Sequence, residues 1–205
     1  MTPNVEFHFD FGSPNAYFAH KVIPKVEQRT GVKFQYVPIL LGGVFKLANN
    51  ASPIVAFKDT KAKLDYMKIE SYRFVKKHGL TKFKMNPNFP VNTVQIMRGA
   101  IAAEIDGQFD TYVDTVFRAM WEDGLKMDDA EVIKTTLDAA GLDGASTLAR
   151  IQDQAVKDKL LKNTEATVAR GTFGAPTFFV GKEIFFGKDK LRDVEEEIEA
   201  AKQRA

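Results

Sequence analysis

The sequence predicts an α/β fold in which strands at the two ends of the chain flank a long helical segment. Residues 5–11 alternate apolar and polar side chains, the period of a half-buried strand. Residues 41–169 instead repeat apolar side chains at helical spacing. Residues 177–186 return to short apolar runs around a Gly-Lys turn, which is typical of a β-hairpin.

The first 40 residues predict a β-α-β unit. Ser13 follows the strand 5–11 and suits a helix N-cap, while Pro14 suits the first helical position. Gly31 ends this helix, and residues 32–39 are expected to form a second strand. Strands joined through a helix are expected to be parallel.

The middle of the chain contains a series of amphipathic patterns. They predict helices at residues 61–77, 94–105, 109–121 and 128–140. Asp128 and Glu131 resemble a capping box at the start of the last of these, and Gly141 stops it. One further helix is expected to carry on a single face Leu148, Ile151 and Ala155.

The C-terminal residues predict a β-β-α unit. Strands at 177–180 and 183–186 precede an amphipathic helix that begins near Leu191. Together the two ends give βαβ-ββα, the thioredoxin arrangement, with a large all-helical insertion. We therefore expect three parts: residues 1–42 and 170–205 as the two halves of a thioredoxin-like domain, and residues 43–169 as the insertion.

The composition excludes several classes of site. The chain has no cysteine, so it cannot form disulfides, zinc–thiolate sites, iron–sulfur clusters or a cysteine nucleophile, and it cannot be a disulfide oxidoreductase. Its three histidines are isolated in sequence, and we expect no bound metal. A net charge of +2 argues against nucleic acid or an anionic membrane as partner.

The sequence also suggests a location. It contains no apolar run long enough to span a bilayer, which takes roughly 20 residues. The first ten residues lack the basic and apolar regions of a signal peptide. We expect a cytoplasmic protein without membrane contact.

Ser13 is the first candidate functional residue. It lies where a strand ends and a helix begins, the edge of an α/β sheet at which ligands bind. A hydroxyl donor beside the positive end of a helix would stabilise a thiolate. Taken alone, this segment favours an ordinary helix cap over that function. No histidine base or G-x-S-x-G motif supports a role as acyl-transfer nucleophile.

Two further segments are candidates. Pro176 begins a strand either as an edge residue or as a cis-proline. If the bond is cis, the N–H and C=O of Ala175 could pair with an extended peptide. Asp189 could cap the last helix or accept hydrogen bonds from a ligand ammonium. Aromatic side chains that could line a substrate pocket, or belong to the core, are Phe89, Phe186 and Trp121.

The chain resembles the DsbA-like branch of the thioredoxin superfamily, in particular kappa-class glutathione transferases and, more closely, 2-hydroxychromene-2-carboxylate isomerases. The resemblance spans nearly the whole chain in order and rests on the stretches FDFGSPNAY, KAKLDYMK, NPNFPVN, FRAMWEDG, FGAPTFFVG and EIFFGKD. Each stretch alone is weak evidence, whereas the ordered set is specific.

The resemblance implies roles for matching residues. Ser13 would hydrogen-bond the sulfur of glutathione in place of the first cysteine of C-x-x-C. The glutathione backbone would pair with Ala175 and Pro176, and its γ-glutamyl end would be held by Phe186, Gly187, Lys188 and Asp189. Candidate substrate contacts are Lys46, Asn49, Asn50, Asn88 and Phe89. Phe89 stands where the isomerases place a tyrosine beside the substrate, and residues 48–59 align poorly with them.

The implied function is a glutathione-dependent isomerase of 2-hydroxychromene-2-carboxylate or a related aromatic-degradation intermediate. Its partners would be glutathione as cofactor and a small aromatic carboxylate as substrate, and relatives suggest a homodimer. One alternative is a kappa-type glutathione transferase or peroxidase. Another is a non-enzymatic thioredoxin-like protein that binds glutathione or peptides.

Overall fold

A mixed four-stranded sheet lies at the centre of the molecule. The computed structural model describes residues 2–204. The strands are β1 (Val5–Phe9), β2 (Phe34–Pro38), β3 (Thr177–Val180) and β4 (Glu183–Phe186), in the order β2-β1-β3-β4. β1 pairs in parallel with β2 and antiparallel with β3, and β3 forms a hairpin with β4. Both ends of the chain thus contribute to one sheet, as the sequence predicted.

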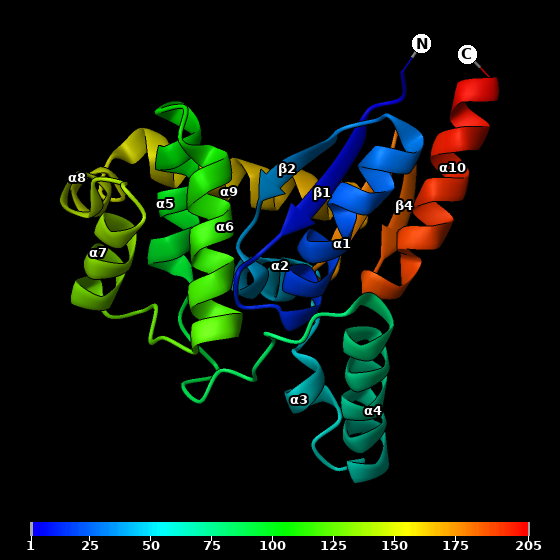
Figure 1. The fold of residues 1–205 in the computed structure, drawn as a ribbon, viewed down its shortest axis with the longest axis horizontal. Coiled ribbons are helices and arrows are strands. Elements are labelled where there is room, and N and C mark those ends of the chain that lie inside the picture. Colours follow the sequence, from blue (N-terminus) through cyan, green and yellow to red (C-terminus); the bar gives the residue numbers. More distant parts are fainter. Residues whose placement is uncertain (1, 205) are drawn as a thin grey trace.

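Helices cover both faces of this sheet. α1 (Pro14–Thr30) and α10 (Leu191–Gln203) pack together on one face, where α10 contacts β3 (Figure 1). Phe7 and Phe178 stack on this side with ring centroids 5.4 Å apart and belong to the main core. α9 (Gln154–Ala169) contacts β2. The guanidinium of Arg170, directly after α9, lies 3.6 Å from the ring centroid of Phe179.

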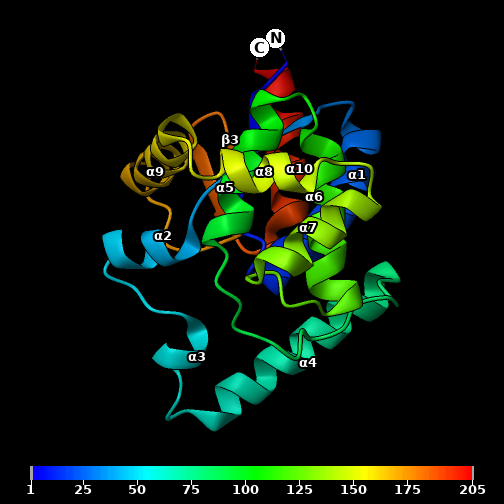
Figure 2. The ribbon, with the colours of Figure 1, turned by 90° about the vertical axis from the view of Figure 1, so that its left-hand side faces the viewer.

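The segment between β2 and β3 is helical. It contains α2 (Leu41–Leu47), α3 (Pro53–Ala56), α4 (Lys61–His78), α5 (Val94–Ile105), α6 (Phe109–Arg118), α7 (Ala130–Ala139) and α8 (Gly144–Arg150), followed by α9. α5 to α8 gather beside the sheet, whereas α3 and α4 project at the bottom of both views (Figures 1 and 2). Phe74 is the residue of α4 that the fold buries. Among residues 2–204, no helix combines the length and apolar character that a membrane span requires.

Two details of the predicted helices were wrong. The run containing Leu148 and Ile151 is not one helix with Ala155, because α8 ends at Arg150 and Asp153 adopts an extended conformation before α9. The short break preserves the spacing of apolar residues, so the pattern alone could not reveal it. The N-cap of α7 is Asp129 rather than Asp128: the Asp129 carboxylate accepts from the N–H groups of Glu131 and Val132.

The long pattern over residues 109–121 also differs from a single α-helix. α6 ends at Arg118, and residues 119–123 continue as a π-helical turn. Gly124 ends this turn at a φ of +70°, a left-handed conformation that favours glycine. Trp121 lies in the turn and is fully buried, so it belongs to the core and does not line an open pocket.

Candidate functional site

Ser13 occupies the junction that the sequence predicted. It is the N-cap of α1, and its Oγ accepts a hydrogen bond from the N–H of Ala16 at 3.2 Å. Pro14 follows at the first helical position, and Gly31 ends the 17-residue helix in a left-handed conformation. The side chain is buried, with 5% of Ser13 exposed. The hydroxyl therefore lies at the positive end of a long helix and away from bulk water.

The C-terminal half of the chain meets Ser13 directly. Ser13 Oγ donates a hydrogen bond to the carbonyl oxygen of Ala175 at 2.9 Å. The peptide bond between Ala175 and Pro176 is cis, one of the two alternatives left open by the sequence. No residue within 2–204 accepts a hydrogen bond from the N–H of Ala175. Its carbonyl is thus engaged, and its N–H is left for another partner.

The turn after β4 lies against the same segment. The N–H of Gly187 donates to the carbonyl of Pro176 at 2.9 Å, and Gly187 has a φ of +101°. The rings of Phe186 and Phe173 are in contact, with centroids 4.4 Å apart, and both are partly exposed. They form an apolar surface beside Ala175.

Lys188 and Asp189 form an ion pair whose two members are in very different surroundings. The side chain of Lys188 is buried, whereas that of Asp189 is 63% exposed, and Lys188 Nζ lies 2.8 Å from Asp189 Oδ2. The ammonium of Lys188 also lies 5.4 Å from the ring centroid of Phe74 in α4. Lys188 therefore contacts groups within the protein, and Asp189 presents its carboxylate to solvent.

The suggestion that Asp189 caps the last helix is contradicted. The N-cap of α10 is Lys190, and no side chain caps this helix. Asp189 lies instead in the 3₁₀ turn of residues 188–190. Its carboxylate remains available to a cationic group.

The candidate substrate contacts on α2 and after it are exposed. Lys46 lies in the last turn of α2, and it forms no ion pair with any residue from 2 to 204. Asn49 follows at a φ of +49°. The amide of Asn50 donates to the carbonyl of Phe173 at 2.9 Å, which joins this segment to the loop before Ala175.

Asn88 and Phe89 lie in a loop organised by a buried asparagine. The Oδ1 atom of Asn86 accepts from the N–H of Asn88 at 2.8 Å, and its amide donates to the carbonyls of Met120 and Leu125. Asn88 also donates to the carbonyl of Gly124 at 3.1 Å. Phe89 is half-buried, and its ring centroid lies 6.0 Å from that of Trp121.

Asp10 and Thr93 lie beside the candidate site and hydrogen-bond to each other, and the sequence reasoning did not single them out. Asp10 follows β1 and is buried, with 1% exposed, and its carboxylate accepts hydrogen bonds from three segments of the chain. Burial raises the pKa of the Asp10 carboxyl, while hydrogen bonds from Leu41, Gly12 and Thr93 act in the opposite direction. An acidic residue between two phenylalanines in FDFGSP was the available signal.

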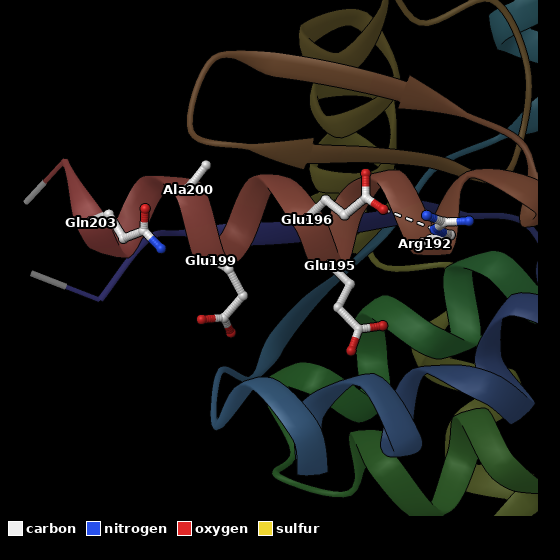
Figure 3. Close-up of a pocket in the computed structure, with 6 residues that line it drawn as sticks. All are labelled: Arg192, Glu195, Glu196, Glu199, Ala200 and Gln203. Atoms are coloured by element: carbon white, nitrogen blue, oxygen red, sulfur yellow. Dashed lines mark hydrogen bonds and ion pairs between the residues drawn. The ribbon is translucent and has the colours of Figure 1, made fainter.

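None of the candidate site residues lines a described surface depression. One depression of about 530 Å³ runs along α10 and is lined by Arg192, Glu195, Glu196, Glu199, Ala200 and Gln203 (Figure 3). Its acidic side chains are paired with Arg29, Arg192 and Lys202. This depression is therefore part of the exposed face of α10. No group of three histidine, aspartate or glutamate side chains within residues 2–204 is arranged to hold a metal ion.

Comparisons with known proteins agree with this fold. Residues 4–199 match the DSBA-like thioredoxin domain, which defines the class of protein. The 2-hydroxychromene-2-carboxylate isomerase of Pseudomonas sp. (strain C18) is 31% identical over 96% of this chain and 91% of its own. The chain belongs to the DsbA-like thioredoxin family, in the branch that contains these isomerases and the kappa-class glutathione transferases.

Other relatives support the same placement. The Pseudomonas putida 2-hydroxychromene-2-carboxylate isomerase is 30% identical over 91% of this chain and 90% of its own. Glutathione S-transferase kappa 1 of Rattus norvegicus is 23% identical over 91% of this chain and 87% of its own. A solved 2-hydroxychromene-2-carboxylate isomerase superposes with a TM-score of 0.84 at 28% identity, covering 98% of this chain and 96% of that one. These relatives support an isomerase, and the α/β thioredoxin-like fold is confirmed.

Proposed function

We propose that this chain is a glutathione-dependent isomerase of 2-hydroxychromene-2-carboxylate or a related aromatic-degradation intermediate. The observation that carries the proposal is the 2.9 Å hydrogen bond from Ser13 to Ala175. It joins the two segments that would receive the thiol and the backbone of glutathione. The names of the related isomerases give the substrate class.

The donors and acceptors of the site fit glutathione. A buried hydroxyl at the positive end of α1 suits a thiolate. The N–H of Ala175, which has no partner within residues 2–204, suits a peptide carbonyl. The exposed carboxylate of Asp189 suits an ammonium. Ser13, Ala175, Pro176 and the turn of Phe186, Gly187, Lys188 and Asp189 would thus hold the cofactor.

When bound, glutathione would supply a thiolate that adds reversibly to a conjugated carbon, so that a double bond becomes a rotatable single bond until the thiolate leaves again. The chain's own contribution is electrostatic and positional. Ser13 has one proton, which it now donates to Ala175 O while accepting from Ala16. Redirecting that proton toward sulfur would stabilise the thiolate without loss of the cap.

Residues outside the thioredoxin-like elements would contact the substrate. Lys46 is an exposed cation without an ion-pair partner among residues 2–204 and suits the substrate carboxylate. Asn49 and Asn88 would provide polar contacts. Phe89 offers an apolar ring and no hydroxyl at its position, which favours a substrate with an apolar face there.

The test compares turnover with and without glutathione. Purified protein is incubated with 2-hydroxychromene-2-carboxylate, the absorbance spectrum is followed, and free thiol is titrated before and after. We expect isomerisation that requires glutathione and leaves its concentration unchanged. No glutathione-dependent conversion would overturn the proposal.

Two other outcomes would indicate the alternative functions. Loss of thiol in step with substrate would indicate a transferase of the kappa type, the class of the rat relative. Absence of glutathione binding by calorimetry at millimolar ligand would indicate a non-enzymatic protein. We also propose a cytoplasmic homodimer, and light scattering of the purified chain tests the oligomeric state.

A further inference from the structure

Three backbone segments of the candidate site converge on one buried carboxylate. Asp10 Oδ1 accepts from the N–H of Gly12 at 2.8 Å, directly before Ser13. Asp10 Oδ2 accepts from the N–H of Leu41 at 2.8 Å, in the first turn of the helix that carries Lys46. Asp10 Oδ2 also accepts from the hydroxyl of Thr93 at 3.1 Å, in the segment that follows Phe89.

The backbone of Asp10 adds a fourth contact. Its carbonyl accepts from the N–H of Ser13 at 3.1 Å, so Asp10 holds the Ser13 turn through both its side chain and its main chain. No lysine, arginine or histidine of residues 2–204 forms an ion pair with this carboxylate. Its buried oxygens are therefore satisfied by hydrogen bonds from the site itself.

Asp10 takes part in the hydrogen bonding at the starts of α5 and α2. Thr93 is the N-cap of α5, yet its hydroxyl does not cap that helix and donates to Asp10 instead. α2 likewise has no side-chain cap from its own N-cap residue, Leu40. The first turn of α2 thus donates a backbone N–H to Asp10, and the N-cap residue of α5 donates its hydroxyl to Asp10.

Gly12 shows how closely these groups approach. A Cβ at Gly12 would lie 3.0 Å from Thr93 Cγ2 and 3.3 Å from Asp10 Oδ1. A side chain at position 12 would require Thr93 or Asp10 to move by a few tenths of an ångström beside the Ser13 turn. This close packing is independent of the hydrogen bonds and involves the same junction.

We propose that Asp10 is a positioning residue that fixes the Ser13 turn relative to the Lys46 helix and the loop of Asn88 and Phe89. This rests on the proposed function of that site. Asp10 acts through the segments it holds, and it has no role of its own as proton donor or ligand. The consequence is that removing a hydrogen bond to Asp10 lowers kcat by a larger factor than it raises the Kd for glutathione.

The sharpest test removes one donor and leaves the carboxylate in place. Thr93→Val deletes the hydroxyl at nearly constant volume, and Thr93→Ser retains it. We expect Thr93→Val to lower kcat about tenfold with the Kd for glutathione within about twofold, and Thr93→Ser to keep wild-type turnover. Thr30→Val is the matched control, because Thr30 is a buried, hydrogen-bonded threonine at the far end of α1.

A second variant tests the carboxylate itself. Asp10→Asn places an amide N–H₂ group among partners that are all donors, so at least one contact is lost. We expect kcat to fall about 100-fold. Three results would overturn the proposal, whether or not Asp10→Asn folds. Thr93→Val could keep wild-type turnover, or Thr93→Ser could lose as much turnover as Thr93→Val. The loss in Thr93→Val could also be no larger than the loss in Thr30→Val.

The position of the turn can also be measured without substrate. The single tryptophan, Trp121, donates from Nε1 to the carbonyl of Phe11 at 2.8 Å, so its emission reports on this turn. We expect Thr93→Val, but not Thr93→Ser, to shift that emission and to speed hydrogen exchange at the amides of Gly12 and Leu41. Unchanged emission and exchange would overturn the proposal even if the protein proves not to be an isomerase. Wild-type protein without isomerase activity overturns the proposed function alone.

Discussion

Ser13 and Ala175 lie 162 residues apart and share a hydrogen bond of 2.9 Å between the serine hydroxyl and the alanine carbonyl. The same Oγ accepts from the N–H of Ala16. A hydroxyl has one proton, so the carbonyl of Ala175 and a bound sulfur compete for it. A ligand that took up this proton would therefore weaken a contact between the two ends of the sheet-forming chain.

Replacing Ser13 by alanine removes this proton. We expect Ser13→Ala to raise the pKa of the bound glutathione thiol and to lower kcat by about 10²–10³, the usual loss when one preorganised donor is removed. Thiolate absorbance of the complex and steady-state kinetics measure the two effects. An unchanged absorbance and rate would show that Ser13 only caps α1.

The control for this variant is a helix cap elsewhere. Asp143 caps α8 by accepting from the N–H of Ser146 at 2.8 Å. We expect Asp143→Ala to lower the free energy of unfolding by about 1 kcal/mol, as Ser13→Ala also should, and to leave turnover unchanged.

Asp189→Ala removes the exposed carboxylate of the pair with Lys188. We expect the Kd for glutathione to rise clearly, with kcat at saturation changed far less, because the lost contact is with the ligand's ammonium. Since Asp189 is largely exposed, the ion pair contributes at most about 1 kcal/mol to stability. Calorimetry checks the affinity, and an unchanged Kd would remove Asp189 from the site.

Gly174→Ala tests the apolar surface beside Ala175. A Cβ at Gly174 would lie 2.8 Å from Phe186 Cε2 and 3.2 Å from Cζ. Because 43% of Phe186 is exposed, its ring can move, so we expect weaker glutathione binding with little loss of folding stability. In a Phe186→Leu background the clash is relieved, and Gly174→Ala should have no further effect. Additive losses in the double variant would contradict this coupling.

His8 predicts a pH dependence of folding stability. Burial lowers the pKa of His8, although Glu6, whose Oε2 lies 2.8 Å from His8 Nε2, opposes the shift. The unfolded chain therefore takes up a proton near about pH 6.5 more readily than the folded chain does. Stability should fall as the pH drops from about 7.5 to about 5, and this slope should be smaller in His8→Gln.

Denaturant unfolding at the two pH values measures the slope. The pKa of His78 is also lowered by burial, but His78 is more exposed than His8. His78→Gln should therefore flatten the profile less than His8→Gln. Identical slopes in the wild type and in His8→Gln would contradict the assignment.

Local sequence patterns predicted the structural features that depend on residues close together in the sequence. The cap at Ser13 and the helix end at Gly31 follow from side-chain and backbone preferences within a few residues, and both are confirmed. The hairpin around Gly181 is confirmed for the same reason. The break before Asp153 was missed because apolar spacing continues through it.

Contacts between distant residues could not be predicted in this way. The role of Asp10 depends on Leu41 and Thr93, which are 31 and 83 residues further along the chain. The resemblance placed Lys188 among the residues that would hold glutathione, but it could not show that this side chain is buried beside Phe74, a residue of a helix far away in sequence. Where a residue contacts segments far away in the sequence, packing decides the direction of its side chain, and a single sequence does not reveal that packing.

The central position of β1 has a consequence for biosynthesis. β1 is synthesised before the other strands and pairs with β2 soon afterwards, but its other edge pairs with β3, which follows the whole helical segment. Until the ribosome has synthesised all the intervening helices, an aromatic-rich strand keeps one edge open to pairing with other chains. The nascent chain should therefore depend on chaperones until β3 emerges, and it should fold late for a protein so rich in helix.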